Sequence, residues 1–166
     1  MPVKIFTLML FFFYHASAND KSELIIHNEP KNILINDLFD SEGSVINILE
    51  QNKDFIILNF WATWCAPCVK EIPDLLKVQR TYKNKYKIFF VSVGFTPVKD
   101  VEKFVDKNSF NEMNILFDND LKFSKDIKVK NIPSTIILNN EGKEVVRVLG
   151  YIDWNNDRNK MILEEL

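Results

Sequence analysis

The sequence predicts a single α/β domain over residues 31–166, built on one mixed β-sheet with helices on both faces. Residues 55–61, FIILNFW, are apolar, β-branched and aromatic, which is typical of a buried parallel strand. From there strand-like and helix-like segments alternate as far as residue 138, and a last strand follows after a short turn. A chain of 166 residues is long enough for one such domain with a buried core.

The segment before the main strand predicts an N-terminal β-hairpin. Residues 32–39 and 45–49 carry apolar side chains, and the sequence Asp-Ser-Glu-Gly at 40–43 between them is typical of a turn. Residues 51–54 are polar and separate this hairpin from the main strand.

A helix is predicted from about residue 67 to residue 83. Its apolar residues recur at intervals of three and four, which places them on one face of the helix. Pro73 lies inside this segment and removes a backbone donor, so we expect a kink about one turn into the helix.

The second half of the chain continues the alternation. We expect strands at residues 86–93, 114–117, 134–138 and 143–149, and helices that begin at Pro97 and near Asp120. A last short helix that carries Met161 is expected after residue 153. The sequence Asn-Asn-Glu-Gly joins the last two strands and predicts an antiparallel pair. No internal repeat and no second domain is indicated.

The first 30 residues have a different character. Lys4 precedes an apolar run over residues 5–14, and Ala-Ser-Ala at 16–18 supplies the small residues that a signal peptidase requires. We therefore expect an exported, periplasmic or extracytoplasmic protein whose signal peptide, residues 1–18, is cleaved. An uncleaved anchor is the alternative, although the apolar run is shorter than the roughly 20 residues that span a bilayer. Residues 19–30 are polar and patternless, and we expect a flexible tether.

Composition argues against several kinds of partner. The 21 basic residues nearly balance the 23 acidic ones, so no basic surface for nucleic acid is indicated. The four glycines form no glycine-rich loop, so we expect no nucleotide cofactor. Zinc takes four ligands, whereas the chain beyond residue 18 offers two cysteines and one histidine, His27, so we expect no metal site.

The two cysteines, Cys65 and Cys68, follow the main strand at the start of the predicted helix. Free N–H groups and the helix dipole favour the thiolate of Cys65 there, and Cys68, one turn further in, is expected to be the more buried, resolving thiol. Pro67 fits the first turn of a helix. A purely structural disulfide is the alternative, but a bridge over so short a loop removes little chain entropy. The redox-active disulfide is the only redox group that we expect.

Two neighbours of the cysteines have candidate roles. Glu71 follows Cys68 by three residues, on the same helix face, where its carboxylate is placed to exchange a proton with the resolving thiol. A surface glutamate in a helical ion pair is the alternative. Trp64, adjacent to Cys65, is a candidate for the wall of a substrate groove, with core packing as the alternative.

The motif NFWATWCAPC at residues 59–68 resembles the active-site motif of the thioredoxin superfamily, and it is most similar to the exported TlpA/ResA-like branch. Residues 129–135, VKNIPST, resemble the family's cis-proline loop, and residues 95–117 resemble its characteristic insertion. The resemblance implies a thioredoxin-like fold. Asn59 stands where cytosolic thioredoxins have a buried aspartate, which shifts any acid–base role toward Glu71.

The resemblance also implies roles for single residues. Pro133 would follow a cis peptide bond and pack beside the cysteines. The backbone of Ile132 would pair with an extended substrate segment. Glu71 matches the active-site glutamate of the cytochrome c maturation members. The expected substrate-binding residues are Trp64, Ala66, Pro67, Ile132 and Pro133.

Three functions are compatible with these features. The first is an exported reductase of protein disulfides, supplied with electrons by a membrane-bound donor; apocytochrome c is the family's best-known substrate. The second is a disulfide oxidase or isomerase that uses the same two cysteines. The third is a peptide- or metal-binding module without turnover. The sequence favours the first.

Overall fold

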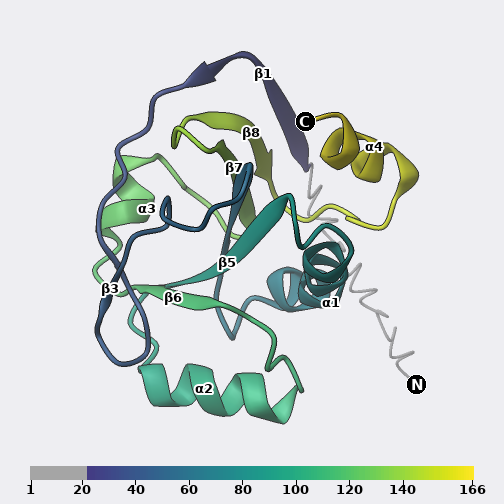
Figure 1. Ribbon diagram of the computed structural model, residues 1–166. Coiled ribbons are helices and arrows are strands. Elements are labelled where there is room, and N and C mark those ends of the chain that lie inside the picture. Colours follow the sequence, from purple (N-terminus) through teal and green to yellow (C-terminus); the bar gives the residue numbers. More distant parts are fainter. Residues whose placement is uncertain (1–21) are drawn as a thin grey trace, which may run out of the picture.

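One eight-stranded mixed sheet organises the chain in a computed structural model that describes residues 22–166, with strand order β1-β8-β7-β4-β5-β6-β2-β3 (Figure 1). The strands are β1 (Glu23–Lys31), β2 (Leu38–Phe39), β3 (Val45–Ile46), β4 (Phe55–Trp61), β5 (Tyr86–Val93), β6 (Ile115–Asp118), β7 (Ser134–Asn139) and β8 (Glu144–Leu149). The helices are α1 (Ala66–Thr81), α2 (Val98–Lys107), α3 (Lys122–Asp126) and α4 (Asp157–Glu165). The signal peptide predicted at residues 1–18 lies outside the described residues.

Strand β4 lies in the middle of the sheet, as its apolar sequence predicts. It pairs in parallel with β5 and antiparallel with β7, and all but its first residue are buried. Because β7 runs against β4, the end of β4 lies beside the start of β7, with Phe60 opposite Ser134. The chain segments that follow β4 and precede β7 therefore lie together at the same end of these two central strands.

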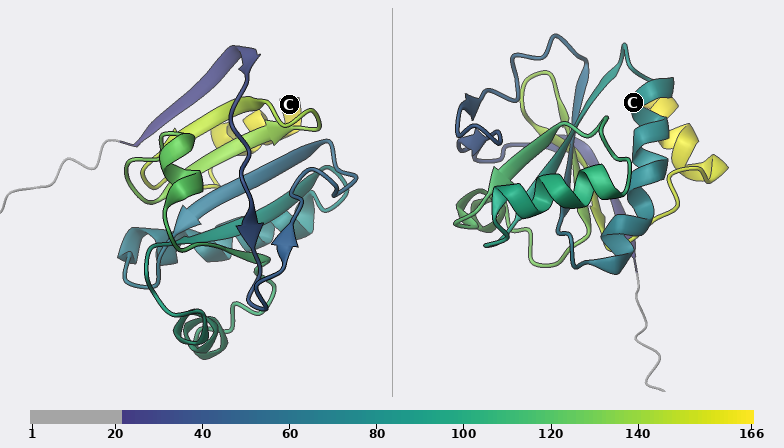
Figure 2. Two further views of the ribbon diagram at one scale, coloured as in Figure 1. Left: turned by 90° about the vertical axis from the view of Figure 1, so that its left-hand side faces the viewer. Right: turned by 90° about the horizontal axis from the view of Figure 1, so that it is seen from below.

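Helices cover both faces of the sheet, which confirms the predicted layering (Figures 1 and 2). Residues of α1, α2 and α4 share one apolar core with alternate residues of the central strands, including Trp61 and Phe90. Phe123 of α3 and Leu38 of β2 belong to a second core on the opposite face. Among the described residues, no helix has the length and apolar character to cross a membrane.

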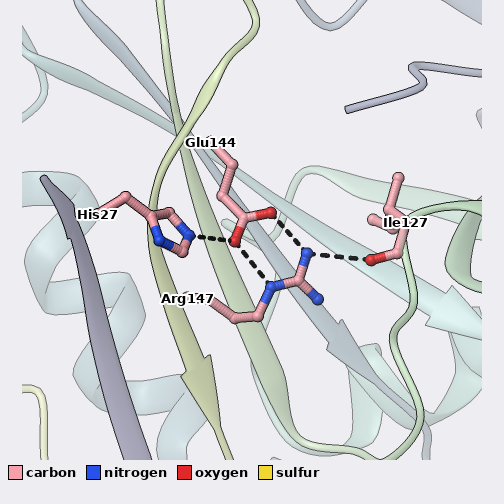
Figure 3. A network of polar contacts seen from close by, with 4 residues as sticks. All are labelled: His27, Ile127, Glu144 and Arg147. Atoms are coloured by element: carbon pink, nitrogen blue, oxygen red, sulfur yellow. Dashed lines mark hydrogen bonds and ion pairs between the residues drawn. The ribbon is translucent and has the colours of Figure 1, made fainter. Parts of the chain in front are cut away.

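The expected tether is wrong for most of its length, because residues from Glu23 onward form strand β1. This strand pairs antiparallel with β8 at the edge of the sheet. Its His27 contributes a ring nitrogen 2.7 Å from the carboxylate of Glu144, a buried residue of β8 (Figure 3). Strand β1 was not predicted because it contains many polar residues. One of them, His27, makes a buried contact with Glu144, which an apolar alternation cannot indicate.

Smaller differences concern the ends of elements. The predicted hairpin forms, but its strands β2 and β3 have only two residues each. Helix α3 begins at Lys122, close to the expected start near Asp120, whose carboxylate accepts a hydrogen bond from the N–H of Lys122. The carboxylate of Asp118 accepts hydrogen bonds from the next two N–H groups, those of Phe123 and Ser124. Pro73 lies inside the continuous helix α1.

Candidate active site

Cys65 and Cys68 form a disulfide at the N-terminus of α1. Cys65 is the N-cap residue, and its sulfur accepts a hydrogen bond from the backbone N–H of Cys68 over 3.3 Å. Pro67 lies in the first turn, where its missing N–H leaves no helical bond unmade. Cys65 is 5% exposed and Cys68 is fully enclosed. Cys68 is therefore the more buried of the two cysteines, as predicted.

Glu71 lies on the inner face of α1 and is 1% exposed, which excludes the alternative of a surface glutamate in an ion pair. Its carboxylate accepts a hydrogen bond of 2.6 Å from the side-chain amide of Asn59 in β4. The same amide donates to the hydroxyl of Thr135, 3.0 Å away in β7. The β4–β7 register places Asn59 opposite Thr135, so the sheet itself holds the polar partners of Glu71.

Burial raises the pKa of Glu71 from its ordinary 4.5 to about 8, because the charged carboxylate loses its hydration. The hydrogen bond from Asn59 is the strongest opposing effect, and polar contacts from Trp154 and the backbone of Ile152 act in the same direction. The nearby carboxylate of Asp74 adds a small further rise. Glu71 thus gains and loses its proton within the range in which thiols also titrate.

The peptide bond between Ile132 and Pro133 is cis, as the resemblance implied. The carbonyl of Pro133 accepts a hydrogen bond from the N–H of Gly150 over 2.9 Å, which ties this loop to the end of β8. Ser134 donates its hydroxyl to the carbonyl of Asn131 over 2.7 Å. Two hydrogen bonds thus fix the loop beside the end of β4, where the cysteines follow.

A groove of about 830 Å³ lies between this loop and the start of α1. Four of the five expected substrate-binding residues line it: Trp64, Pro67, Ile132 and Pro133. The fifth, Ala66, is exposed but does not line the groove. Trp64 is 72% exposed, which supports its assignment to the groove wall, whereas Trp61 is fully buried and belongs to the core.

Within residues 22–166, no three His, Cys, Asp or Glu side chains lie close enough together to hold a metal ion. His27 contacts Glu144 at the edge of the sheet.

Some parts of this site could not be predicted from the sequence. The contact of Asn59 with Glu71 and Thr135 depends on strand register, although an asparagine inside an apolar strand was a signal of a buried polar contact. Trp154, which precedes α4 and contributes to the surroundings of Glu71, carried no such signal.

Comparison with known proteins finds a match to the AhpC/TSA family over residues 32–147. A curated relative is the thiol-disulfide oxidoreductase ResA of Bacillus cereus, which is 28% identical over 141 residues, covering 84% of this chain and 79% of ResA. The exposed lipoprotein thioredoxin Etrx1 of Streptococcus pneumoniae has a similar structure, with a TM-score of 0.68 at 21% identity over 78% of this chain and 98% of Etrx1. A thiol:disulfide interchange protein from Bacteroides sp. gives a TM-score of 0.68 at 20% identity over 82% of this chain and 88% of its own. The thioredoxin-like fold predicted from the sequence is therefore confirmed.

Proposed function

This chain belongs to the AhpC/TSA family, and on that premise we propose that it is a thiol–disulfide oxidoreductase that reduces disulfides in other proteins. The observation that carries the proposal is the Cys65–Cys68 disulfide, placed at a helix N-terminus beside a groove that Pro133 helps to line. The name of the B. cereus relative, a thiol-disulfide oxidoreductase, supports the same chemistry.

The reaction begins from the dithiol form. The Cys65 thiolate attacks one sulfur of a substrate disulfide, so that a mixed disulfide forms and one substrate thiolate leaves and takes up a proton. Cys68 then loses its proton and attacks the Cys65 sulfur, which breaks the mixed disulfide and releases the second substrate sulfur as a thiolate that takes up a proton from the solvent. Two electrons have passed from the protein to the substrate, and the protein is left with the Cys65–Cys68 disulfide.

Glu71 is the acceptor that we assign to the proton of Cys68. It lies one helical turn after Cys68, and both residues are enclosed. In the disulfide form the pKa of Glu71 is about 8, so at neutral pH its carboxyl group retains the proton that Cys68 has released. When a donor reduces the disulfide again, the same proton returns to the Cys68 thiolate.

The groove would hold the substrate as an extended segment. The main chain of Ile132 makes no backbone hydrogen bond with the rest of residues 22–166, so it is free to pair with a visiting strand. Trp64 and Pro67 form the opposite wall, next to Cys65. This arrangement brings a substrate disulfide to the reactive sulfur.

The biological setting is part of the proposal. The leader pattern at residues 1–18 and the likeness to an exposed lipoprotein thioredoxin support an exported, extracytoplasmic protein. Reduction in that compartment needs electrons from elsewhere, so we propose a membrane-bound dithiol donor. Apocytochrome c, with its Cys-x-x-Cys-His haem site, is the substrate to test first.

Two cysteine variants test the function. Cys65→Ser should abolish the reduction of insulin with dithiothreitol, because no nucleophile remains at the groove. Cys68→Ser should instead accumulate a mixed disulfide with the substrate, visible on a non-reducing gel, because the resolving thiol is missing. Normal turnover by Cys65→Ser would remove the proposal.

The direction of the reaction is tested by the reduction potential of the Cys65–Cys68 couple. A reductant should have a potential near the roughly −270 mV of thioredoxin. A value near or above about −120 mV would instead assign the protein as an oxidase.

A further inference from the structure

A second hollow, of about 580 Å³, continues the active-site groove toward the edge strand β1. The two hollows share Lys130, Asn131 and Leu149 in their walls, so they adjoin along the cis-proline loop. The second one reaches His27 and Lys31 of β1. A segment bound at Cys65 therefore has a path along the protein surface that is longer than the active-site groove alone.

Among the charged side chains that line this path, the basic ones outnumber the acidic ones. The first groove is lined by Lys125 and Lys130 and by no acidic residue, and Lys31 and Lys128 line the second. None of these four lysines forms an ion pair within the described part of the chain. All four are exposed, so their ammonium groups are available to a visitor.

The second hollow is also lined by Arg147, Glu144 and Asp126. Glu144 accepts two hydrogen bonds from Arg147, of 2.5 and 2.8 Å, and contacts His27, so the charges of this buried pair largely cancel (Figure 3). The carboxylate of Asp126 accepts a hydrogen bond of 2.6 Å from the neutral amide of Asn36 and keeps its negative charge, so the path carries four lysines against this one carboxylate. The excess positive charge of the path thus comes from the four lysines, on a chain whose formal net charge is −2.

We propose that this path selects protein substrates that carry acidic residues next to the reactive disulfide. The inference rests on the proposed function, since the occupant is the substrate segment itself. Asp and Glu side chains of that segment would lie against Lys125, Lys128 and Lys130 while its disulfide meets Cys65. Exposed charges act mainly on the encounter rate, so the selection should weaken at high salt.

Three peptides test the selection directly. Each carries the same small disulfide ring, flanked on both sides by three Asp, three Ser or three Lys residues. The second-order rate constant for oxidation of the reduced protein by each peptide is followed through tryptophan fluorescence. In low salt we expect the rate constant to be highest for the Asp peptide, lower for the Ser peptide and lowest for the Lys peptide. The Asp and Lys peptides should differ by about tenfold, which corresponds to several exposed ion pairs. In about 0.5 M salt the three should converge.

The triple variant Lys125→Gln, Lys128→Gln, Lys130→Gln should reduce the Asp-to-Lys ratio to below about threefold. This ratio is insensitive to any change in Cys65 reactivity, which enters every rate constant equally. The matched control replaces three exposed lysines away from the groove, Lys77, Lys83 and Lys107, by Gln and should keep the full ratio. Circular dichroism checks that both variants are folded.

The outcomes separate the two proposals. Equal rates for all three peptides with the unmodified protein in low salt would overturn the selection and leave the reductase intact. The same would follow if the control variant lost the ratio as fully as the groove variant, because net charge alone would then explain it. Failure to react with even the Ser peptide would count against the proposed function itself.

Discussion

At the residue scale, the burial of Glu71 links protein stability to pH. Its pKa is about 8 in the folded protein and 4.5 ordinarily. Between these values the unfolded chain has released a proton that the folded protein still holds. Below pH 4.5 the titration of Glu71 costs no stability. As the pH rises from there toward 8, it progressively lowers the free energy of unfolding.

We predict that Glu71→Gln removes this loss, because the amide imitates the protonated carboxyl and does not titrate. Between about pH 5 and pH 8 the unmodified protein should lose about 3 kcal/mol of unfolding free energy relative to the variant. Urea unfolding of the disulfide form at several pH values measures the difference. The surface variant Glu102→Gln should follow the unmodified protein. Parallel curves for Glu71→Gln and the unmodified protein would refute the assignment.

The site residues that lie close together in the sequence could be predicted from their spacing. Cys65, Cys68 and Glu71 lie within two helical turns of each other, and the motif around Pro133 was recognisable in the sequence. The partners of Glu71 come instead from β4, from β7 and from the segment before α4. Such contacts depend on strand register and on the docking of the C-terminal segment, which no local pattern encodes.

At the element scale, one buried polar cluster fastens the edge strand β1 to the sheet. Glu144 of β8 contacts His27 of β1, and Arg147 of β8 donates both to Glu144 and to the carbonyl of Ile127, which follows α3 (Figure 3). Burial opposes the charge on Glu144, but the hydrogen bonds from Arg147 and His27 hold its pKa below the ordinary value. The cluster therefore connects β1, β8 and the segment between α3 and the cis-proline loop.

Replacing Glu144 by Ala should destabilise the protein by about 3–5 kcal/mol, because it leaves the mostly buried guanidinium of Arg147 without a counter-charge. Hydrogen exchange measured by mass spectrometry should accelerate first in β1 and in residues 127–131, before it does so in α1. Glu141→Ala in the neighbouring exposed turn is the control and should have little effect. A small stability change with Glu144→Ala, confined to β8, would contradict this role.

The stabilisation by Glu144 also depends on pH. Because its pKa is lowered in the folded protein, its contribution is present above the ordinary carboxyl range and is lost as the pH falls through the folded-state value. The two residues thus act in opposite directions: protonation of Glu144 lowers the stability in acid, and ionisation of Glu71 lowers it in mild alkali.

Elements with a strong apolar pattern were predicted well, and those without one were not. Strand β5 was expected at residues 86–93 and has those bounds, because nearly every residue in it is buried. Strand β1 has a mostly exposed surface and relies on one polar cluster, so its sequence resembled a tether. The N-terminal hairpin was predicted longer than it is, since its apolar residues pack as a loop beyond two residues of each strand.

At the scale of the whole molecule, we expect the fold to depend little on the disulfide. The core is formed by a sheet with apolar layers on both faces, and Cys65–Cys68 closes a loop of only three residues' separation at its edge. Chain-entropy estimates for so short a loop give about 2 kcal/mol. The fold should therefore stand without the bridge.

We predict that the double variant Cys65→Ala, Cys68→Ala unfolds cooperatively in urea, with a free energy of unfolding within about 2 kcal/mol of the disulfide form of the unmodified protein. The unmodified protein in excess dithiothreitol serves as the comparison, since it loses the bridge but keeps both sulfur atoms. If the variant fails to fold, or melts without cooperativity, the disulfide is a structural staple and its place in the proposed reaction needs revision.

The overall architecture was predictable because alternation of strand and helix patterns limits the possible topologies to a few. The alternation did not predict the edge strand β1, which is held by pairing with β8 rather than by burial. The mixed central sheet and its layers of helices followed from apolar spacing, whereas the position of β1 beside β8 did not.

The exposed indole beside Cys65 gives the molecule a built-in optical probe. Of its three tryptophans, Trp61 and Trp154 are enclosed and only Trp64 meets solvent. Quenching by iodide should thus act on a single chromophore, and that chromophore directly precedes Cys65 in the sequence. Emission spectroscopy can follow occupancy at this spot without any attached dye.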